Sequence, residues 1–160
     1  LIRRLLGEGR ISAANTLLGR PYEIVGRVVR GAGRGRGLGF PTANIQTPNE
    51  ILPRGVFITE AKIVGRSYPS LTNIGYRPTF GSGPLHVETH IFDSMGTLYH
   101  RRIGLRLLRK LREEQKHPDP KGLIIQVRKD VAAARAYFGR RRISVTGEAR
   151  GHRRLTFSSS

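Results

Sequence analysis

The sequence predicts a mostly β protein, namely an antiparallel barrel followed by one amphipathic helix. Two observations favour this fold class. Several short segments rich in β-branched residues are separated by Gly/Pro turns, a pattern typical of antiparallel barrels. Near the C-terminus, apolar residues at helical spacing follow Asp119-Pro120, which is a good N-cap and first-turn pair. The 160 residues suit one domain with short extensions.

The first half of the chain contains one predicted helix and several predicted strands. Residues 11–18 are expected to be helical, because Gly19 is a suitable C-cap and Pro21 follows it. Strands are predicted where β-branched residues concentrate between turns, at residues 22–30, 55–64 and 70–74. The glycine-rich segment between the first two of these strands is expected to be a loop.

Two later segments alternate between apolar and polar residues, which indicates strands with one buried face. In residues 86–93, one face carries Val87, Thr89 and Ile91, and the other carries Glu88, His90 and Phe92. In residues 103–112, one side carries Ile103, Leu105, Leu107 and Leu111, and the other carries Arg106, Lys110 and Arg112. The terminal helix is expected to pack through Leu123, Val127, Val131, Ala134 and Phe138.

The composition limits the classes of function. The chain has no cysteine, so it forms neither disulfides nor thiolate metal sites, and we expect it in the reducing cytoplasm. No apolar run approaches the length of a membrane span. The net charge of +18 attracts polyanions. Residues 139–160 carry six arginines and one glutamate, a net +5 of this charge, and their weak apolar periodicity predicts a disordered basic tail.

The segment GAGRGRGLGFPTAN, residues 31–44, is the strongest functional signal. Glycines bring backbone N–H groups close to a ligand, and successive N–H groups form an anion site to which arginines add charge. The side-chain oxygens of Thr42 and Asn44 can both face a Mg²⁺ that carries nucleotide phosphates. The segment therefore predicts a loop that holds a nucleoside triphosphate and its metal.

Other interpretations of this segment stay open. Arg-Gly repeats also occur in disordered RNA-binding segments, and a glycine-rich stretch can be a plain link. The ending LGFPTAN favours the phosphate site, because a disordered tract needs no Pro stop followed by a specific polar pair. The sequence contains no GxxxxGK[ST], and GxGxxG does not fit these glycines, so a P-loop or Rossmann enzyme is not expected.

Glu88 is the best candidate for a general base. In phosphoryl transfer the protein mainly positions groups and neutralises charge, while one base orients the nucleophile. The alternative is an ordinary surface carboxylate. His90, on the same face, is either a second base or a hydrogen-bonded structural histidine. Tyr99 and Arg112 either hold a planar ligand or are ordinary strand-end residues.

Seven motifs follow one another along the chain, namely GRPYEIVGRVVRGAGRGRGLGFPTAN, LPRGVF, TNIGYRPTF, VETHIFD, LYHRRI, LREEQKH and KDVAAA. With these motifs in this order, the chain resembles the riboflavin kinase module of bacterial bifunctional riboflavin kinase/FAD synthetases from about residue 1 to 138. The resemblance implies a six-stranded Greek-key barrel and transfer of the ATP γ-phosphate to the ribityl 5′-hydroxyl of riboflavin, giving FMN. It also implies that residues 1–20 are a connector from an upstream FMN adenylyltransferase domain and that residues 21–138 are the kinase domain.

The resemblance assigns a role to each site residue. It places Mg²⁺ and phosphate at Thr42 and Asn44, and catalysis at Glu88. The other residues implied on the ATP side are Gly31, Gly33, Arg34, Gly35, Arg36, Ile91, Asp93 and Tyr99. On the flavin side they are Arg112, Gln115 and His117. The chain departs from the family at His117 and Ser94, where phenylalanine is common, and at His100, where glycine is common.

Three functions therefore compete. The favoured one is a riboflavin kinase with ATP and Mg²⁺, with no membrane partner. The second is a basic barrel that binds RNA without catalysis, which would bind polynucleotides with a steep salt dependence. The third is a module that binds flavin without turnover and regulates a partner domain.

Overall fold

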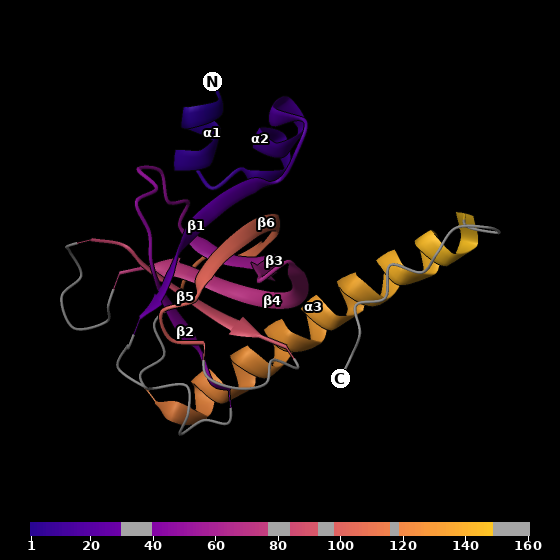
Figure 1. The fold of residues 1–160 in the computed structure, drawn as a ribbon. Coiled ribbons are helices and arrows are strands. Elements are labelled where there is room, and N and C mark those ends of the chain that lie inside the picture. The colour runs from indigo at the N-terminus through magenta and orange to yellow at the C-terminus, as the bar shows by residue number, and fades with distance from the viewer. Residues whose placement is uncertain (30–39, 77–83, 93–97, 116–118, 149–160) are drawn as a thin grey trace.

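The computed structural model describes residues 1–29, 40–76, 84–92, 98–115 and 119–148, and this part contains three helices and six strands (Figure 1). The helices are α1 (Ile2–Gly7), α2 (Ile11–Leu18) and α3 (Pro120–Glu148). The strands are β1 (Tyr22–Val29), β2 (Ala43–Gln46), β3 (Gly55–Ile63), β4 (Arg66–Gly75), β5 (His86–Ile91) and β6 (Arg102–Arg112).

The strands close into a barrel in the order β1-β2-β5-β4-β3-β6. Every neighbouring pair is antiparallel. β3, β4 and β5 are consecutive neighbours, and β6 returns to lie beside β3, which is the Greek-key arrangement. The predicted fold class, a six-stranded antiparallel Greek-key barrel with a C-terminal helix, is confirmed.

Most predicted elements match the structure closely. The helix at residues 11–18 has the expected bounds, and Gly19 has a φ of 72°, the left-handed conformation of a glycine C-cap. The strand predicted at residues 70–74 is the second half of the longer β4. Two elements were not predicted, α1 and the four-residue β2. β2 is too short to show a period, and it is a strand because β1 and β5 pair with its two edges.

The inward faces of the strands form the main hydrophobic core. Val87, Thr89 and Ile91 are buried, as the alternation in residues 86–93 predicted. Four buried hydroxyls also lie inside. Thr59 hydrogen-bonds to Ser70 at 2.6 Å and to Thr72 at 2.8 Å, and Thr72 donates to Thr89 at 3.0 Å. Because the Thr89 side chain points inward, its neighbour Glu88 points to the outer face of the barrel.

β6 does not keep one alternation along its length. Its pairing with β3 shifts register twice, between Val56 and Phe57 and between Ile58 and Thr59, as at β-bulges. Leu111 therefore does not share the inner side with Leu105, as the alternation predicted; it packs in the cluster under α3. Bulges of this kind cannot be seen in one strand, since they arise from its pairing with a neighbour.

α1 and α2 cover one end of the barrel (Figure 1). Leu5, Leu6, Ile11 and Ala14 are buried in the same cluster as the barrel interior. Asn15 fastens α2 to two strands: its Nδ2 donates to the Leu107 carbonyl at 2.8 Å, and its Oδ1 accepts from the Tyr22 N–H at 2.8 Å. The segment expected to be a connector therefore packs against the end of the barrel.

Leu6 tests this packing. Leu6→Ala is expected to lower the free energy of unfolding by about 2–3 kcal/mol, the lower part of the range for buried leucines, because the end of a barrel can partly relax into the space. Urea unfolding followed by circular dichroism measures the change. The exposed Leu17 of α2 is the control, and Leu17→Ala should change stability by less than about 0.5 kcal/mol. Equal effects of the two substitutions would contradict a structural role for α1.

α3 lies against the outer wall of the barrel. Ala134 and Phe138 are buried there against Val56, Ile58 and Leu71, as the predicted apolar stripe requires. The Asp119 side chain accepts a hydrogen bond from the Gly122 N–H at 2.7 Å, which confirms the predicted N-cap.

α3 continues to Glu148 and extends away from the barrel (Figure 1). Residues 139–148 are therefore helical, in contrast to the disordered tail expected from residue 139. Their arginines are good helix formers and continue a helix that packing has already nucleated. The rest of the expected tail, residues 149–160, lies outside the described residues. None of the helices in the described part combines the length and apolar character that a membrane span needs.

Candidate functional site

Glu88 and Asn44 lie directly opposite each other on neighbouring strands. β5 pairs with β2 in the register Asn44↔Glu88, and with β4 in the register Asn73↔Glu88. Directly opposed residues of antiparallel strands share a face, and their Cβ atoms are about 4.5–5.5 Å apart. A row of three polar side chains therefore crosses the outer wall of the barrel. We call Asn44, Glu88 and Asn73 the polar row.

The members of the polar row are open to ligands. Asn44 and Glu88 are half-buried, while Asn73 and the nearby Thr42 are exposed. Among the described residues, the side chains of Thr42, Asn44 and Glu88 make no hydrogen bond or ion pair with one another or with a neighbour. These polar oxygens are therefore not used by the fold and are accessible to a ligand.

The side-chain oxygens of Thr42 and Asn44 are of the kind that a hard divalent cation binds. Mg²⁺ keeps most of its waters and phosphate oxygens, and it takes only one or two protein oxygens directly. The described residues contain no group of three or more His, Cys, Asp or Glu that could hold a metal by itself. The site therefore suits a metal that arrives with the phosphates of a nucleotide, and does not suit a tightly held resident metal.

His90 holds the backbone next to the polar row. Its Nδ1 is 2.8 Å from the Pro41 carbonyl oxygen, and its ring meets Phe40 and Phe92 edge to face, with centroids 6.0 Å and 5.3 Å away. These contacts are those of the structural histidine, one of the two roles that the sequence left open. They engage one ring nitrogen and hold the imidazole against two aromatic rings.

Arg112 is engaged with α3. Its Nε and Nη2 donate to the Asp130 carboxylate at 2.8–3.2 Å, and its Nη1 donates to the Glu113 carbonyl at 3.0 Å. Gln126 donates a further hydrogen bond to Asp130 at 3.0 Å. Asp130 is 5% exposed, and such a carboxylate is tolerated because a bidentate arginine satisfies it.

Sequence reasoning missed Asp130, although a signal exists. Asp130 precedes Ala134 by four residues and Phe138 by eight, so it lies on the apolar stripe of α3. An acid at a core-facing position predicts a buried partner. The partner, Arg112, occupies the position on β6 that pairs with Val56, and Val56 in turn pairs with Asn73. Arg112 therefore lies in the same row of paired strand residues as Asn44, Glu88 and Asn73, beyond Val56.

The remaining predicted site residues are spread over other places. The Ile91 side chain is in the barrel core, facing away from the polar row, so only its backbone is available to a nucleotide. Tyr99 is half-buried against the same core, and Gln115 is exposed just beyond β6. The other predicted residues lie outside the described residues, namely Gly31, Gly33, Arg34, Gly35, Arg36, Asp93 and His117.

His100 has a φ of 66°, in the left-handed region that favours glycine. This conformation would suit the glycine that the resemblance leads us to expect at this position. Its carbonyl accepts a hydrogen bond from Arg27 at 3.2 Å, and its N–H donates to the Val28 carbonyl at 2.8 Å. The departure at His100 is accommodated by backbone contacts of the turn before β6.

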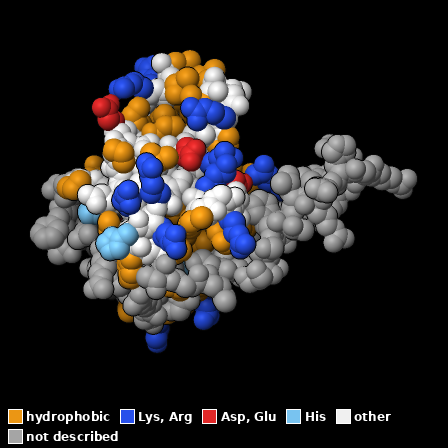
Figure 2. All heavy atoms as spheres, in the orientation of Figure 1, with side chains coloured by type: hydrophobic (Ala, Val, Ile, Leu, Met, Phe, Trp, Pro, Cys, Tyr) orange, Lys and Arg blue, Asp and Glu red, His pale blue; other side chains and the backbone are white. Residues whose placement is uncertain are grey.

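Basic side chains are dispersed over the face of the molecule shown in Figure 2, between apolar and neutral ones. Nucleic-acid-binding domains instead concentrate lysine and arginine along one stripe or patch. Several arginines are also neutralised locally, such as Arg54 by Glu114 at 3.3 Å and Arg106 by Glu60 at 3.7 Å. This face gives the RNA-binding alternative no support.

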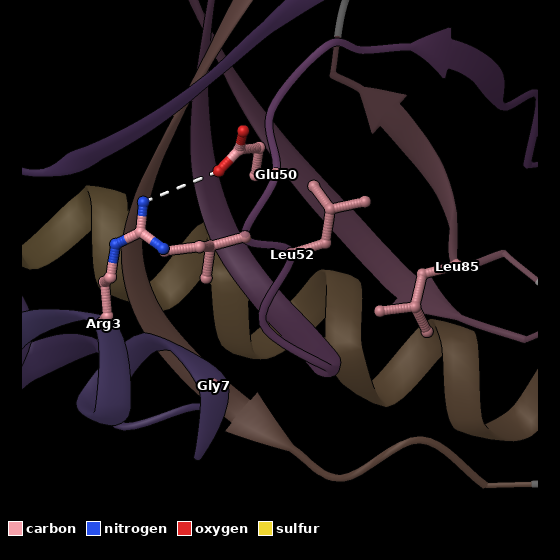
Figure 3. Close-up of a pocket in the computed structure, with 6 residues that line it drawn as sticks. Arg3, Gly7, Glu50, Leu52 and Leu85 are labelled. Atoms are coloured by element: carbon pink, nitrogen blue, oxygen red, sulfur yellow. Dashed lines mark ion pairs between the residues drawn. The ribbon is translucent and has the colours of Figure 1, made fainter.

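A recess of about 510 Å³ lies elsewhere, beside α1 (Figure 3). It is lined by Arg3, Gly7, Glu50, Ile51, Leu52 and Leu85. Two highly exposed side chains of its lining, Arg3 and Glu50, form an ion pair of 3.5 Å. The lining contains no member of the polar row, and its one carboxylate is engaged in this ion pair. We therefore take the polar row as the candidate site.

Comparison with known proteins agrees with this geometry. The family model described as "Flavokinase: Riboflavin kinase" matches residues 18–138. A bifunctional riboflavin kinase/FMN adenylyltransferase of Pseudomonas fluorescens is 43% identical over 137 residues, which cover 84% of this chain and 44% of that relative. The chain thus spans less than half the length of this curated relative.

Two solved structures share the architecture. A protein of Streptococcus pneumoniae described as a macrolide-efflux protein superposes with a TM-score of 0.78 at 29% identity, over 84% of this chain and 45% of that one. Riboflavin kinase from Trypanosoma brucei superposes with a TM-score of 0.54 at 22% identity, over 74% of this chain and 80% of that one. At this identity the second likeness supports the fold.

The family match includes the whole barrel, from β1 to β6, and most of α3. It also includes the three strands that carry the polar row, β2, β5 and β4. The chain belongs to the riboflavin kinase family.

Proposed function

We propose that this chain transfers the γ-phosphate of ATP to the ribityl 5′-hydroxyl of riboflavin, giving FMN and ADP. The observation that carries the proposal is the register Asn44↔Glu88, which brings a carboxylate and an amide oxygen together on one open face. Membership of the riboflavin kinase family supports the choice of substrates.

In the proposed reaction each residue of the site has one role. Thr42 and Asn44 supply oxygens to Mg²⁺, which neutralises phosphate charge when it is bound. Glu88 accepts the proton of the attacking 5′-hydroxyl. The hydroxyl oxygen then forms a bond to the γ-phosphorus, and the bond between this phosphorus and the bridging oxygen of ADP breaks.

The binding sites for the two substrates are also part of the proposal. The glycine and arginine residues 31–36 hold the ATP phosphates, and Ile91, Asp93 and Tyr99 lie on the nucleotide side. Gln115 and His117 lie on the flavin side. Arg112 acts there through its hold on the Glu113 carbonyl, since much of its guanidinium is engaged by Asp130.

A partner domain is proposed from the relatives. The Pseudomonas fluorescens protein is named for both a riboflavin kinase and an FMN adenylyltransferase, and this chain covers 44% of it. We infer that the chain works beside an FMN adenylyltransferase domain that precedes α1 in a longer protein, and that this protein is cytoplasmic.

A kinase assay tests the function directly. The protein is incubated with riboflavin and Mg-ATP, and FMN is measured by chromatography, with quenching of riboflavin fluorescence as a second readout. FMN formation supports the proposal. Quenching without FMN would favour the regulatory alternative, and salt-dependent polynucleotide binding without quenching would favour the RNA-binding alternative.

Asn44 tests the metal role. Asn44→Ala is expected to raise the Mg²⁺ concentration needed for half-maximal activity, because one of the few protein oxygens offered to the ion is lost. A Mg²⁺ titration of the kinase rate at saturating ATP measures the change. Gln46→Ala, an exposed amide side chain on the same strand but outside the polar row, is the matched control and should leave the titration unchanged. An identical titration for Asn44→Ala and the unaltered protein would contradict the assignment.

A further inference from the structure

Two ring–ring contacts and one guanidinium–ring contact connect Phe40, which precedes β2, with α3. The His90 ring lies edge to face against both Phe40 and Phe92, with centroids 6.0 Å and 5.3 Å away. The Arg135 guanidinium of α3 lies over the Phe92 ring, 4.8 Å from its centroid. His90 therefore occupies a packed position between the loop that ends in Thr42 and Asn44 and the body of the protein.

The hydrogen bond from His90 has a fixed direction. The Pro41 carbonyl oxygen only accepts, so the Nδ1 of His90, 2.8 Å away, carries the hydrogen. This donor is present in both the neutral and the charged imidazole. The bond thus fixes the ring without depending on the protonation of Nε2.

Little else in the described part of the chain fixes the backbone of residues 40–42. The pairing of β2 with β5 begins at Ala43↔Thr89, and Pro41 has no N–H to donate. Among the described residues, the bond from His90 is the one that reaches this stretch of backbone. Glu88 lies two residues before His90 on the same face of β5, so one strand carries the carboxylate and the group that holds the opposing loop.

We propose that His90 is a positioning residue that holds the Pro41 carbonyl, and through it keeps Thr42 and Asn44 beside Glu88. The effect on the Mg²⁺ response rests on the proposed kinase function. The effect on the backbone of residues 40–44 does not. His90 touches neither substrate nor metal in this proposal. It acts through the backbone that leads to the two metal-binding side chains.

Two substitutions separate the hydrogen bond from the ring packing. His90→Phe keeps an aromatic ring between Phe40 and Phe92 but removes the donor. His90→Asn removes the ring but keeps a side-chain N–H near the place of Nδ1. The control is His86→Asn, because His86 lies on the same face of β5 and pairs with Gly75, away from Pro41.

The first measurement is amide hydrogen exchange of Ala43 and Asn44, the first residues of β2 that pair with β5, in the protein without substrates. His90→Phe is expected to speed exchange at these amides about 3- to 10-fold, the effect of one lost hydrogen bond, whereas His90→Asn and His86→Asn should stay within about twofold of the unaltered protein. Unchanged exchange in His90→Phe, or equally fast exchange in His90→Asn, would overturn the positioning role.

The second measurement is the kinase assay. His90→Phe is expected to raise the half-saturating Mg²⁺ concentration about 3- to 10-fold while the KM for riboflavin stays within twofold, and His90→Asn should restore the Mg²⁺ response. A rise in both constants would overturn the proposal, because it would show general damage to the site. If the unaltered protein makes no FMN but exchange changes as expected, the kinase function is wrong and the positioning role stands.

Discussion

Replacing Glu88 with glutamine is expected to lower the turnover number for FMN formation by about two to four orders of magnitude, the usual contribution of general acid–base catalysis. Glutamine has nearly the size of glutamate and can accept a hydrogen bond from the 5′-hydroxyl, but it cannot take up the proton. The fold should be unaffected, because Glu88 makes no ion pair with any described residue and lies on the outer face of β5. Steady-state kinetics with saturating riboflavin and Mg-ATP measures the change.

Glu60→Gln is the matched control for Glu88→Gln. Glu60 is also a half-buried strand carboxylate, and it lies outside the polar row, where it pairs with Arg106 at 3.7 Å. Its substitution should change turnover by less than about twofold, because Glu60 lies outside the candidate site. Loss of its ion pair with Arg106 should also cost little stability. Near-normal turnover in Glu88→Gln, with KM values also unchanged, would remove Glu88 from the mechanism.

Loss of Asp130 is expected to have the largest effect on stability among the charged residues described. Asp130→Ala should lower the free energy of unfolding by about 3 kcal/mol, because it leaves Arg112 without its buried counter-charge. The side chains of the pair are 6% exposed for Asp130 and 19% for Arg112, so solvent compensates only in part. Urea unfolding of both forms at neutral pH measures the difference.

A double substitution separates stability from flavin binding. In Asp130→Leu combined with Arg112→Met, no charge is left unpaired, and most of the lost stability should return. If Arg112 also acts on the flavin side, this variant should still show a raised KM for riboflavin. A stable double variant with a normal KM would limit Arg112 to a structural role. Equal stability of Asp130→Ala and the unaltered protein would show that the ion pair does not hold α3.

The local pattern of the chain was enough to predict most strands and the terminal helix. A residue period of two or 3.6 is a property of neighbouring residues, and β5 and α3 show it clearly. The predicted side of a residue was wrong where the period of two does not hold along the strand. Leu111 was expected on the inner side of β6, but two register shifts against β3 turn it towards α3.

For the candidate site, the sequence predicted which residues take part, and the fold determined how they are arranged. Glu88 and Asn44 were chosen from the chemistry of their side chains and from the resemblance of VETH and PTAN to family motifs. Their direct opposition across β2 and β5 comes from the closure of the barrel. The pairing of Arg112 with Asp130 likewise depends on where α3 packs against the barrel. The sequence analysis therefore assigned Arg112 to the flavin side and did not predict its ion pair with Asp130.

By itself, the sequence determined the fold class, the family resemblance and the identity of the reactive groups, because alternation, turn residues and motif spelling are encoded in short stretches of chain. Only the tertiary structure decided that α1 and α2 belong to the barrel core, that β2 is a strand, and that His90 holds the Pro41 carbonyl. These features depend on contacts between segments far apart in the chain. Such contacts are selected by the packing of the whole barrel, and no local pattern specifies them.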